Sequence, residues 1–117
     1  MINGWYAGRP YRYAYNMTTT PGWFLFDGIV KVDLQTGTEE RYAFGDGVFA
    51  SETPMAPRPS GRDEDDGYLV TFTTDIVRDC SECLVLDAKN ITAGPIARIR
   101  LPERISSGTH SCWAPAR

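Results

Sequence analysis

The strongest constraint on the fold is the repeated alternation between short β-rich runs and turn-forming residues. In 117 residues we find no window of a dozen with apolar side chains at i, i+3, i+4 and i+7, the pattern of an amphipathic helix. Gly, Pro, Asn and Asp instead separate runs rich in Val, Ile, Tyr, Phe and Thr. The sequence therefore predicts an all-β fold, with strands at 12–16, 23–26, 29–34, 39–44, 67–74, 83–87, 96–101 and 109–113.

A faint internal repeat refines this prediction. A strand ending near Asp33, a turn and a second strand are echoed by a strand ending at Asp87, a turn and a second strand, and the spacing is 87 − 33 = 54 residues. This spacing suits propeller blades of about four strands, although any pair of hairpins with an Asp before the turn would look similar. Propellers close with about four to eight blades. Two antiparallel blades would therefore be part of a larger structure.

The stretch at 50–66 differs from the strands in composition. It contains Pro54, Pro57 and Pro59 and then the acidic run 62–66. Proline cannot donate to a central ladder, so the first half is predicted to be an extended connection. The acidic run is predicted to be a solvated loop that ends in an Asp-Gly turn. Calcium would suit such a cluster of carboxylates, but the spacing of an EF-hand loop is missing.

Composition and charge exclude several classes of protein. The net charge is −3, and the arginines are scattered without forming a stripe that could follow a phosphate backbone, which argues against nucleic acid as a partner. No run approaches the roughly 18 apolar residues of a transmembrane helix. The first residues lack the basic and apolar regions of a secretory signal, so a cytoplasmic location is predicted.

The chain has one histidine, His110. Taken alone, a single histidine near a chain end is more often a structural or surface residue than a metal ligand. Cys80, Cys83 and Cys112 could join it in a Cys3His zinc set that stabilises a binding module. However, no Gly or Pro shapes a zinc knuckle between the first two cysteines, and the second pair has the spacing His-x-Cys.

Several segments, in order along the chain, resemble the C-terminal part of the carotenoid oxygenase family, especially its lignostilbene and apocarotenoid cleavage members. They are Arg9–Asn16, Phe26–Lys31, Ser51–Pro54 with Pro57–Pro59, Glu64–Tyr68, Leu86–Ala88, Ala97–Pro102 and Gly108–His110. No single segment is decisive, and the ordered set carries the resemblance. It extends from about Gly8 to Pro115.

The resemblance implies a seven-bladed β-propeller with a non-haem Fe(2+) ion on its axis, bound by four histidines from different blades. His110 matches the last of these ligands. Glu52 matches a carboxylate that accepts a hydrogen bond from the far nitrogen of a ligand imidazole, and we pair it with His110. The implied reaction is the cleavage of a conjugated carbon-carbon double bond by O2 into two carbonyl products. The implied substrate is a hydrophobic polyene or stilbene.

The resemblance also implies that 1–117 is a partial domain, consisting of the C-terminal blades only, and that 1–8 is a poorly matched N-terminal segment. Because no second histidine is present, we expect the chain alone to be inactive and to require the missing blades. A different class stays open: a non-catalytic protein that pairs with a partner through exposed blade edges.

Overall fold

The computed structural model describes residues 1–106 and 108–116. Within them lie eight strands, two 3-10 turns and no α-helix, which confirms the all-β prediction. The elements are η1 (Gly4–Tyr6), β1 (Tyr13–Thr19), β2 (Phe26–Asp33), β3 (Glu39–Ala43), β4 (Val48–Ala50), β5 (Met55–Pro57), β6 (Gly67–Asp75), β7 (Cys80–Asp87), η2 (Ile91–Ala93) and β8 (Pro95–Arg100). Helices of the length and apolarity that membrane crossing requires are absent from the described residues.

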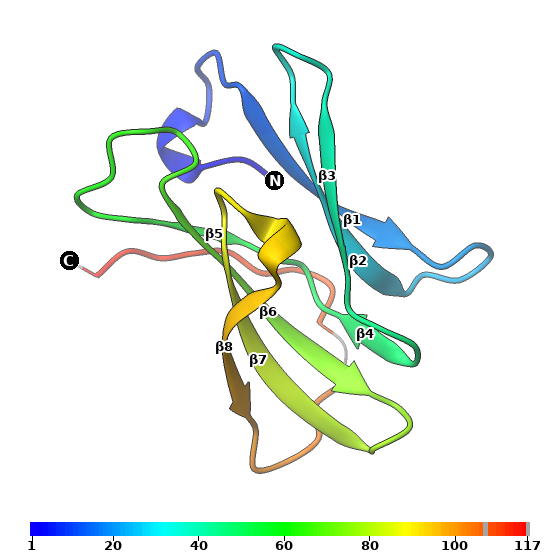
Figure 1. Ribbon diagram of the computed structural model, residues 1–117. Helices are drawn as coiled ribbons and strands as arrows, with labels where there is room; N and C mark the ends of the chain where they lie inside the picture. The colour runs from blue at the N-terminus through cyan, green and yellow to red at the C-terminus, as the bar shows by residue number, and fades with distance from the viewer. Residues whose placement is uncertain (107, 117) are drawn as a thin grey trace.

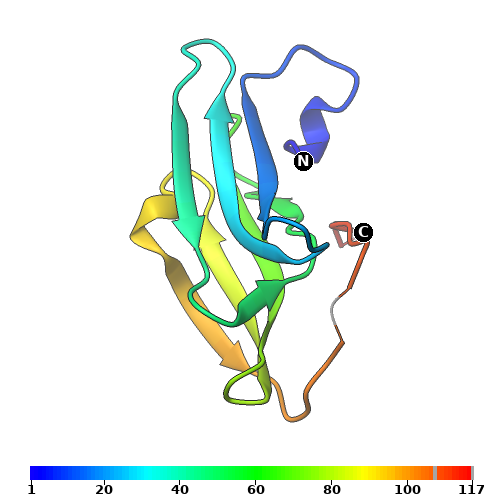
Figure 2. The ribbon, with the colours of Figure 1, turned by 90° about the vertical axis from the view of Figure 1, so that its right-hand side faces the viewer.

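Two antiparallel meanders make up the sheet, β1–β2–β3 and β6–β7–β8. The short strand β4 joins them, because Ala50 pairs with Phe26 of β2 and with Thr73 of β6. Figures 1 and 2 show the two meanders lying against each other, with the connection through β4 at one end. Each meander therefore corresponds to one of the two predicted blades.

The predicted repeat is visible in the strand register. Tyr13 of β1 pairs with Asp33 at the end of β2, and Tyr68 of β6 pairs with Asp87 at the end of β7. Both aspartates also close their turns in the same way, since each Oδ1 accepts the backbone N–H two residues further on at 2.9 Å. The two carboxylates thus have equivalent places in the two meanders, as expected for Asx turns.

The strand boundaries differ from prediction in several places. The predicted strands 23–26 and 29–34 are replaced by the single strand β2, which runs through Asp27 and Gly28 without a turn. Two short strands that both pair with β6 were not predicted: β5 lies in the stretch predicted to be a connection, and β4 ends at Ala50, where that stretch begins. Three residues are too few to show an alternating pattern, and the prolines there are tolerated because β5 is an edge strand. Conversely, Trp23 is in a turn, with its N–H donated to the Thr20 carbonyl at 3.1 Å, and 109–113 form no strand.

The acidic run forms a loop, as predicted, and Arg62 and Asp63 are exposed. The prediction of a solvated loop is wrong for Glu64 and Asp65, which turn toward the first meander. The Glu64 carboxylate accepts the backbone N–H groups of Arg12 at 2.9 Å and Tyr13 at 2.8 Å. Asp65 is buried and receives a hydrogen bond from Lys31 Nζ of β2 at 2.9 Å. Buried carboxylates need such partners. The run therefore connects the second meander to the first one.

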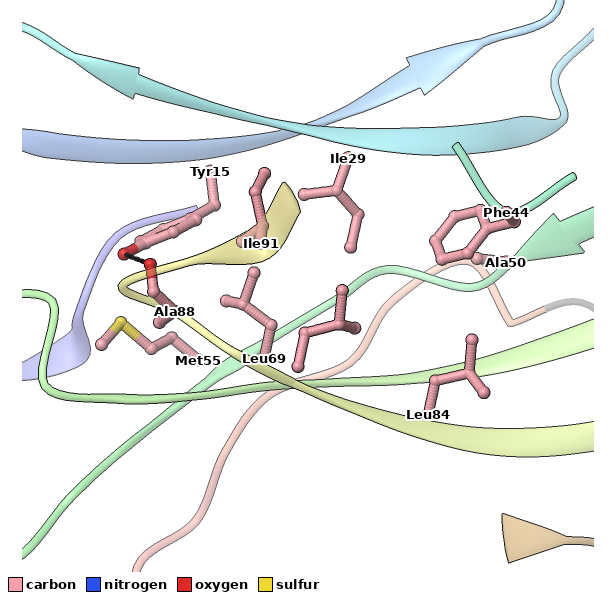
Figure 3. Close-up of a cluster of buried hydrophobic side chains, with 10 residues drawn as sticks. Tyr15, Ile29, Phe44, Ala50, Met55, Leu69, Leu84, Ala88 and Ile91 are labelled. Atoms are coloured by element: carbon pink, nitrogen blue, oxygen red, sulfur yellow. Dashed lines mark hydrogen bonds between the residues drawn. The ribbon is translucent and has the colours of Figure 1, made fainter. Parts of the chain in front are cut away.

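The hydrophobic core fills the space between the two meanders. Figure 3 shows Tyr15 and Ile29 on one side, facing Leu69 and Leu84 on the other. The Tyr15 hydroxyl donates to the Ala88 carbonyl at 3.0 Å, so this buried phenol is satisfied. Its burial also raises the pKa of Tyr15 far above the usual range. The core holds the inner part of the sheet, including the connection between β4 and β5, in place.

Candidate functional site

β4 and β5 pair with two different parts of β6, and together they form an interrupted strand beside the second meander, which we call the inner strand. Glu52 lies where this strand breaks, between β4 and β5. The backbone on either side stays tied to β6: Ser51 N donates to Phe72 O at 2.8 Å, and Val70 N donates to Pro54 O at 3.1 Å. Between these two anchors the chain leaves the ladder. The backbone on either side of Glu52 is therefore held by hydrogen bonds, while the Glu52 side chain remains 30% exposed.

After β8 the C-terminal segment turns back, as Figure 2 shows, and it reaches the break of the inner strand at Glu52. Thr74 Oγ1 of β6 donates to the Ile105 carbonyl at 3.1 Å, and Ile105 N donates to Ser81 Oγ of β7 at 3.1 Å. These bonds direct the segment toward Glu52. Hydrogen bonds to a neighbouring strand thus position residues that belong to no strand themselves.

The C-terminal segment meets Glu52 at Ser111 and His110. Ser111 N donates to Glu52 Oε2 at 2.9 Å, and Ser111 Oγ donates to the Glu52 carbonyl at 3.1 Å. His110 Nδ1 lies 3.4 Å from Glu52 Oε1, a separation slightly longer than an ordinary N–H···O hydrogen bond. The two residues singled out from the sequence are therefore adjacent in space, although they are far apart in the chain.

The imidazole of His110 is open on its other side. Its side chain is 90% exposed. The two ring nitrogens of histidine point in different directions, so a ring that turns Nδ1 toward Glu52 leaves Nε2 directed elsewhere. This arrangement is typical of a metal-ligating histidine, in which one nitrogen donates to a carboxylate and the other offers its lone pair.

The described residues do not assemble a complete metal site. Among them, no group of three or more His, Cys, Asp or Glu side chains converges on one point. Cys80 and Cys83 are three positions apart on β7, so their side chains point to opposite faces of the strand. Burial also raises the pKa of Cys83, which disfavours the thiolate that zinc needs. The predicted alternatives of a Cys3His zinc set and a calcium loop therefore find no support.

Beside the site lies a largely apolar hollow of about 460 Å³. Its walls include Trp5 and Trp113, both about half exposed, together with Met55, Pro54 and Ile2. Ser111 and Cys112 also line the hollow, so it adjoins the segment that carries His110. The inner side of the molecule thus presents uncovered apolar surface next to the candidate ligand.

Ser111 is a site residue that the sequence did not predict. Its only signal in the sequence is its position next to His110, and a serine beside a histidine is too common a pair to indicate a role. The hydrogen bonds that give it a role join positions 59 residues apart. Only the folded chain brings these atoms together.

Comparison with known proteins places the chain among oxygenases. A family model described as retinal pigment epithelial membrane protein matches residues 1–115. The chain is 41% identical over 112 residues to the apocarotenoid-15,15'-oxygenase of Synechocystis sp., covering 92% of this chain and 22% of that protein.

Two solved structures show the same similarity in three dimensions. A lignostilbene dioxygenase of Pseudomonas brassicacearum superposes with a TM-score of 0.90 at 32% identity, over 98% of this chain and 26% of that one. The cobalt-substituted Synechocystis apocarotenoid oxygenase superposes with a TM-score of 0.81 at 35% identity, over 92% and 23%. The chain thus spans about a quarter of the length of the proteins it matches.

Proposed function

The chain belongs to the carotenoid oxygenase family, and on this basis we propose that it is part of a non-haem Fe(2+) dioxygenase to which it contributes one metal ligand, His110. The proposed reaction of the whole enzyme is cleavage of a conjugated carbon-carbon double bond of a carotenoid, apocarotenoid or stilbene, with one oxygen atom of O2 entering each carbonyl product. The names of the similar proteins support the reaction class.

The observation that carries the proposal is the pairing of His110 Nδ1 with the Glu52 carboxylate across 3.4 Å. A carboxylate in this place accepts a hydrogen bond from the Nδ1–H group, fixes the tautomer and the ring orientation, and increases the basicity of Nε2. Nε2 is then the nitrogen that binds the metal. Ligation of Nε2 would favour a shorter contact between Nδ1 and the carboxylate than the present 3.4 Å.

The residues fit an iron ion only as one member of a larger set. When bound, ferrous iron supplies open coordination positions at which O2 can be activated. Its affinity and geometry come from several ligands that converge on one point. This chain has a single histidine, so the remaining imidazoles must come from elsewhere in the enzyme. We therefore expect the 117-residue chain alone to show no turnover of a stilbene or an apocarotenoid.

The test uses a host that supplies the rest of the propeller. Residues 1–115 replace the matching segment of the Synechocystis apocarotenoid-15,15'-oxygenase, and this protein is called the grafted enzyme below. Its iron content is measured by elemental analysis for the parent graft and for His110→Ala. We expect the parent graft to retain iron and His110→Ala to lose most of it.

The control is Glu103→Ala, a substitution at an exposed residue of the same segment. It should leave the iron content unchanged. Equal iron in the parent graft and in His110→Ala would refute the assignment of His110.

A further inference from the structure

We propose that Ser111 is a positioning residue that holds Glu52 at two points, so that one carboxylate oxygen stays directed at His110. This inference rests on the proposed function, because it assigns a purpose to the orientation of the imidazole. It concerns a contact between the C-terminal segment and the inner strand. The contact consists of the Ser111 N–H bond to Glu52 Oε2 at 2.9 Å and the Ser111 hydroxyl bond to the Glu52 carbonyl at 3.1 Å.

The first point of attachment gives the two carboxylate oxygens of Glu52 different partners. Oε2 accepts the backbone N–H of Ser111, while Oε1 is the oxygen that lies 3.4 Å from His110 Nδ1. A glutamate side chain that is 30% exposed would otherwise rotate among several rotamers, with its two oxygens exchanging places. A bond to one oxygen removes that freedom. The other oxygen is then kept for the imidazole.

The second point of attachment is independent of the side chain of Glu52. Ser111 Oγ donates to the Glu52 carbonyl, which also accepts the Ser51 hydroxyl at 3.2 Å. A carbonyl oxygen has two lone pairs and can accept both donors. A single bond would let the C-terminal segment pivot about Glu52. Two bonds of Ser111, one to the side chain and one to the main chain, fix its orientation.

His110 directly precedes Ser111, so the orientation of the segment determines where the imidazole lies. Because the ring is 90% exposed, packing against other side chains contributes little to holding it. Its direction must therefore come from the backbone on which it is mounted and from the carboxylate that it faces. Ser111 constrains both: it is the next residue of that backbone, and its N–H group is bound to the carboxylate.

The first experiment uses the 117-residue chain without metal and compares Ser111→Ala with Ser111→Thr. Amide hydrogen exchange at position 111 should speed up about two- to tenfold in Ser111→Ala, as expected for the loss of one net hydrogen bond. Long-range 1H–15N spectra of the neutral imidazole should show a smaller share of the Nδ1–H tautomer. Ser111→Thr keeps a hydroxyl and should restore both values.

The second experiment follows the loss of iron from the grafted enzyme to a chelator. Ser111→Ala should release iron several-fold faster than the parent graft, Ser111→Thr should resemble the parent, and the exposed Ser106→Ala serves as the matched control. If the 117-residue chain aggregates, iron release from the grafted enzyme still tests the positioning role of Ser111. Release rates for Ser111→Ala equal to those of Ser106→Ala would overturn the proposal.

The two experiments separate this inference from the proposed function. If His110→Ala retains iron in the grafted enzyme, the metal assignment fails, while exchange and tautomer spectra still report whether Ser111 orients the ring. If His110→Ala loses iron but Ser111→Ala behaves like the parent in both experiments, the metal assignment stands and Ser111 has no positioning role.

Discussion

Lys31 of β2 donates a hydrogen bond to Asp65 of the acidic loop at 2.9 Å, and both side chains are almost completely withdrawn from solvent. The ammonium also lies 4.5 Å from the centre of the Tyr13 ring, within the range of a cation–π contact. Lys31 belongs to the first meander and Asp65 to the loop that leads into the second one. This ion pair therefore joins the two blades at a point beside the hydrophobic core.

Removal of one partner should be costly. Asp65→Ala leaves a buried, unpaired ammonium and should lower the free energy of unfolding by about 3 to 5 kcal/mol. The midpoint of urea unfolding, monitored by circular dichroism, measures the change. Replacing both residues, Lys31→Met with Asp65→Leu, should recover most of the stability. An equal effect of Asp65→Ala and of Asp46→Ala, at an exposed aspartate, would contradict the prediction.

Close packing of backbone at Gly28 gives a second prediction. A Cβ atom added at Gly28 would lie 2.6 Å from the Tyr42 carbonyl oxygen and 2.7 Å from Thr18 Oγ1. Because backbone must shift to make room, Gly28→Ala should destabilise the fold by about 1 to 3 kcal/mol in thermal or urea unfolding. Gly4→Ala is the matched control, since nothing lies within 4 Å of its Cβ position. Comparable unfolding midpoints of the two variants would count against this strand register.

The stability should depend on pH through Asp33. Hydrogen bonds from the Arg12 guanidinium hold the pKa of the Asp33 carboxyl well below its usual range. A folded-state pKa lower than that of the unfolded chain stabilises the fold above about pH 4, and this contribution is lost as the pH falls through the folded-state pKa. Asp33→Asn should therefore weaken the dependence of the urea midpoint on pH below about 4.

The Asp33→Asn variant keeps an oxygen that can still accept the N–H groups of the turn, so it removes the charge with little change in shape. Asp46→Asn, at an exposed position, controls for the loss of one negative charge. If both variants follow the acid unfolding curve of the parent chain, the ion pair of Arg12 and Asp33 does not contribute.

Glu52→Gln should weaken iron binding in the grafted enzyme. An amide of the same shape carries no charge and is a poorer acceptor for the Nδ1 proton of His110, so the iron dissociation constant should rise about 10- to 100-fold. Equilibrium dialysis against a chelator measures it. Glu40→Gln, at an exposed residue of β3, should leave the constant unchanged. The same dissociation constant for Glu52→Gln and the parent graft would show that the carboxylate does not support the ligand.

Much of the architecture was predictable because its signals are local. The β-rich runs lie between turn residues, and the spacing from Asp33 to Asp87 predicted two similar units. Their equivalent register, with a tyrosine opposite each aspartate, agrees with that repeat. By contrast, β4 and β5 have three residues each and no periodicity to detect. The acidic run was predicted to be solvated because its local sequence gives no sign that Asp65 pairs with Lys31.

The sequence alone determined the all-β class, the twofold repeat and, through ordered resemblance to a family, His110 and Glu52 as candidates. Its single histidine also limits the chain to one imidazole of any metal site. The resemblance also paired Glu52 with His110, and the structure places His110 Nδ1 3.4 Å from Glu52 Oε1. Only the tertiary structure decided that Ser111 holds Glu52 at two points, and that Glu64 and Asp65 of the acidic loop contact the first meander. The physical reason is that these contacts join atoms from segments far apart in the chain. Such contacts depend on how the two meanders pack. The types of the two residues in a contact do not by themselves predict it.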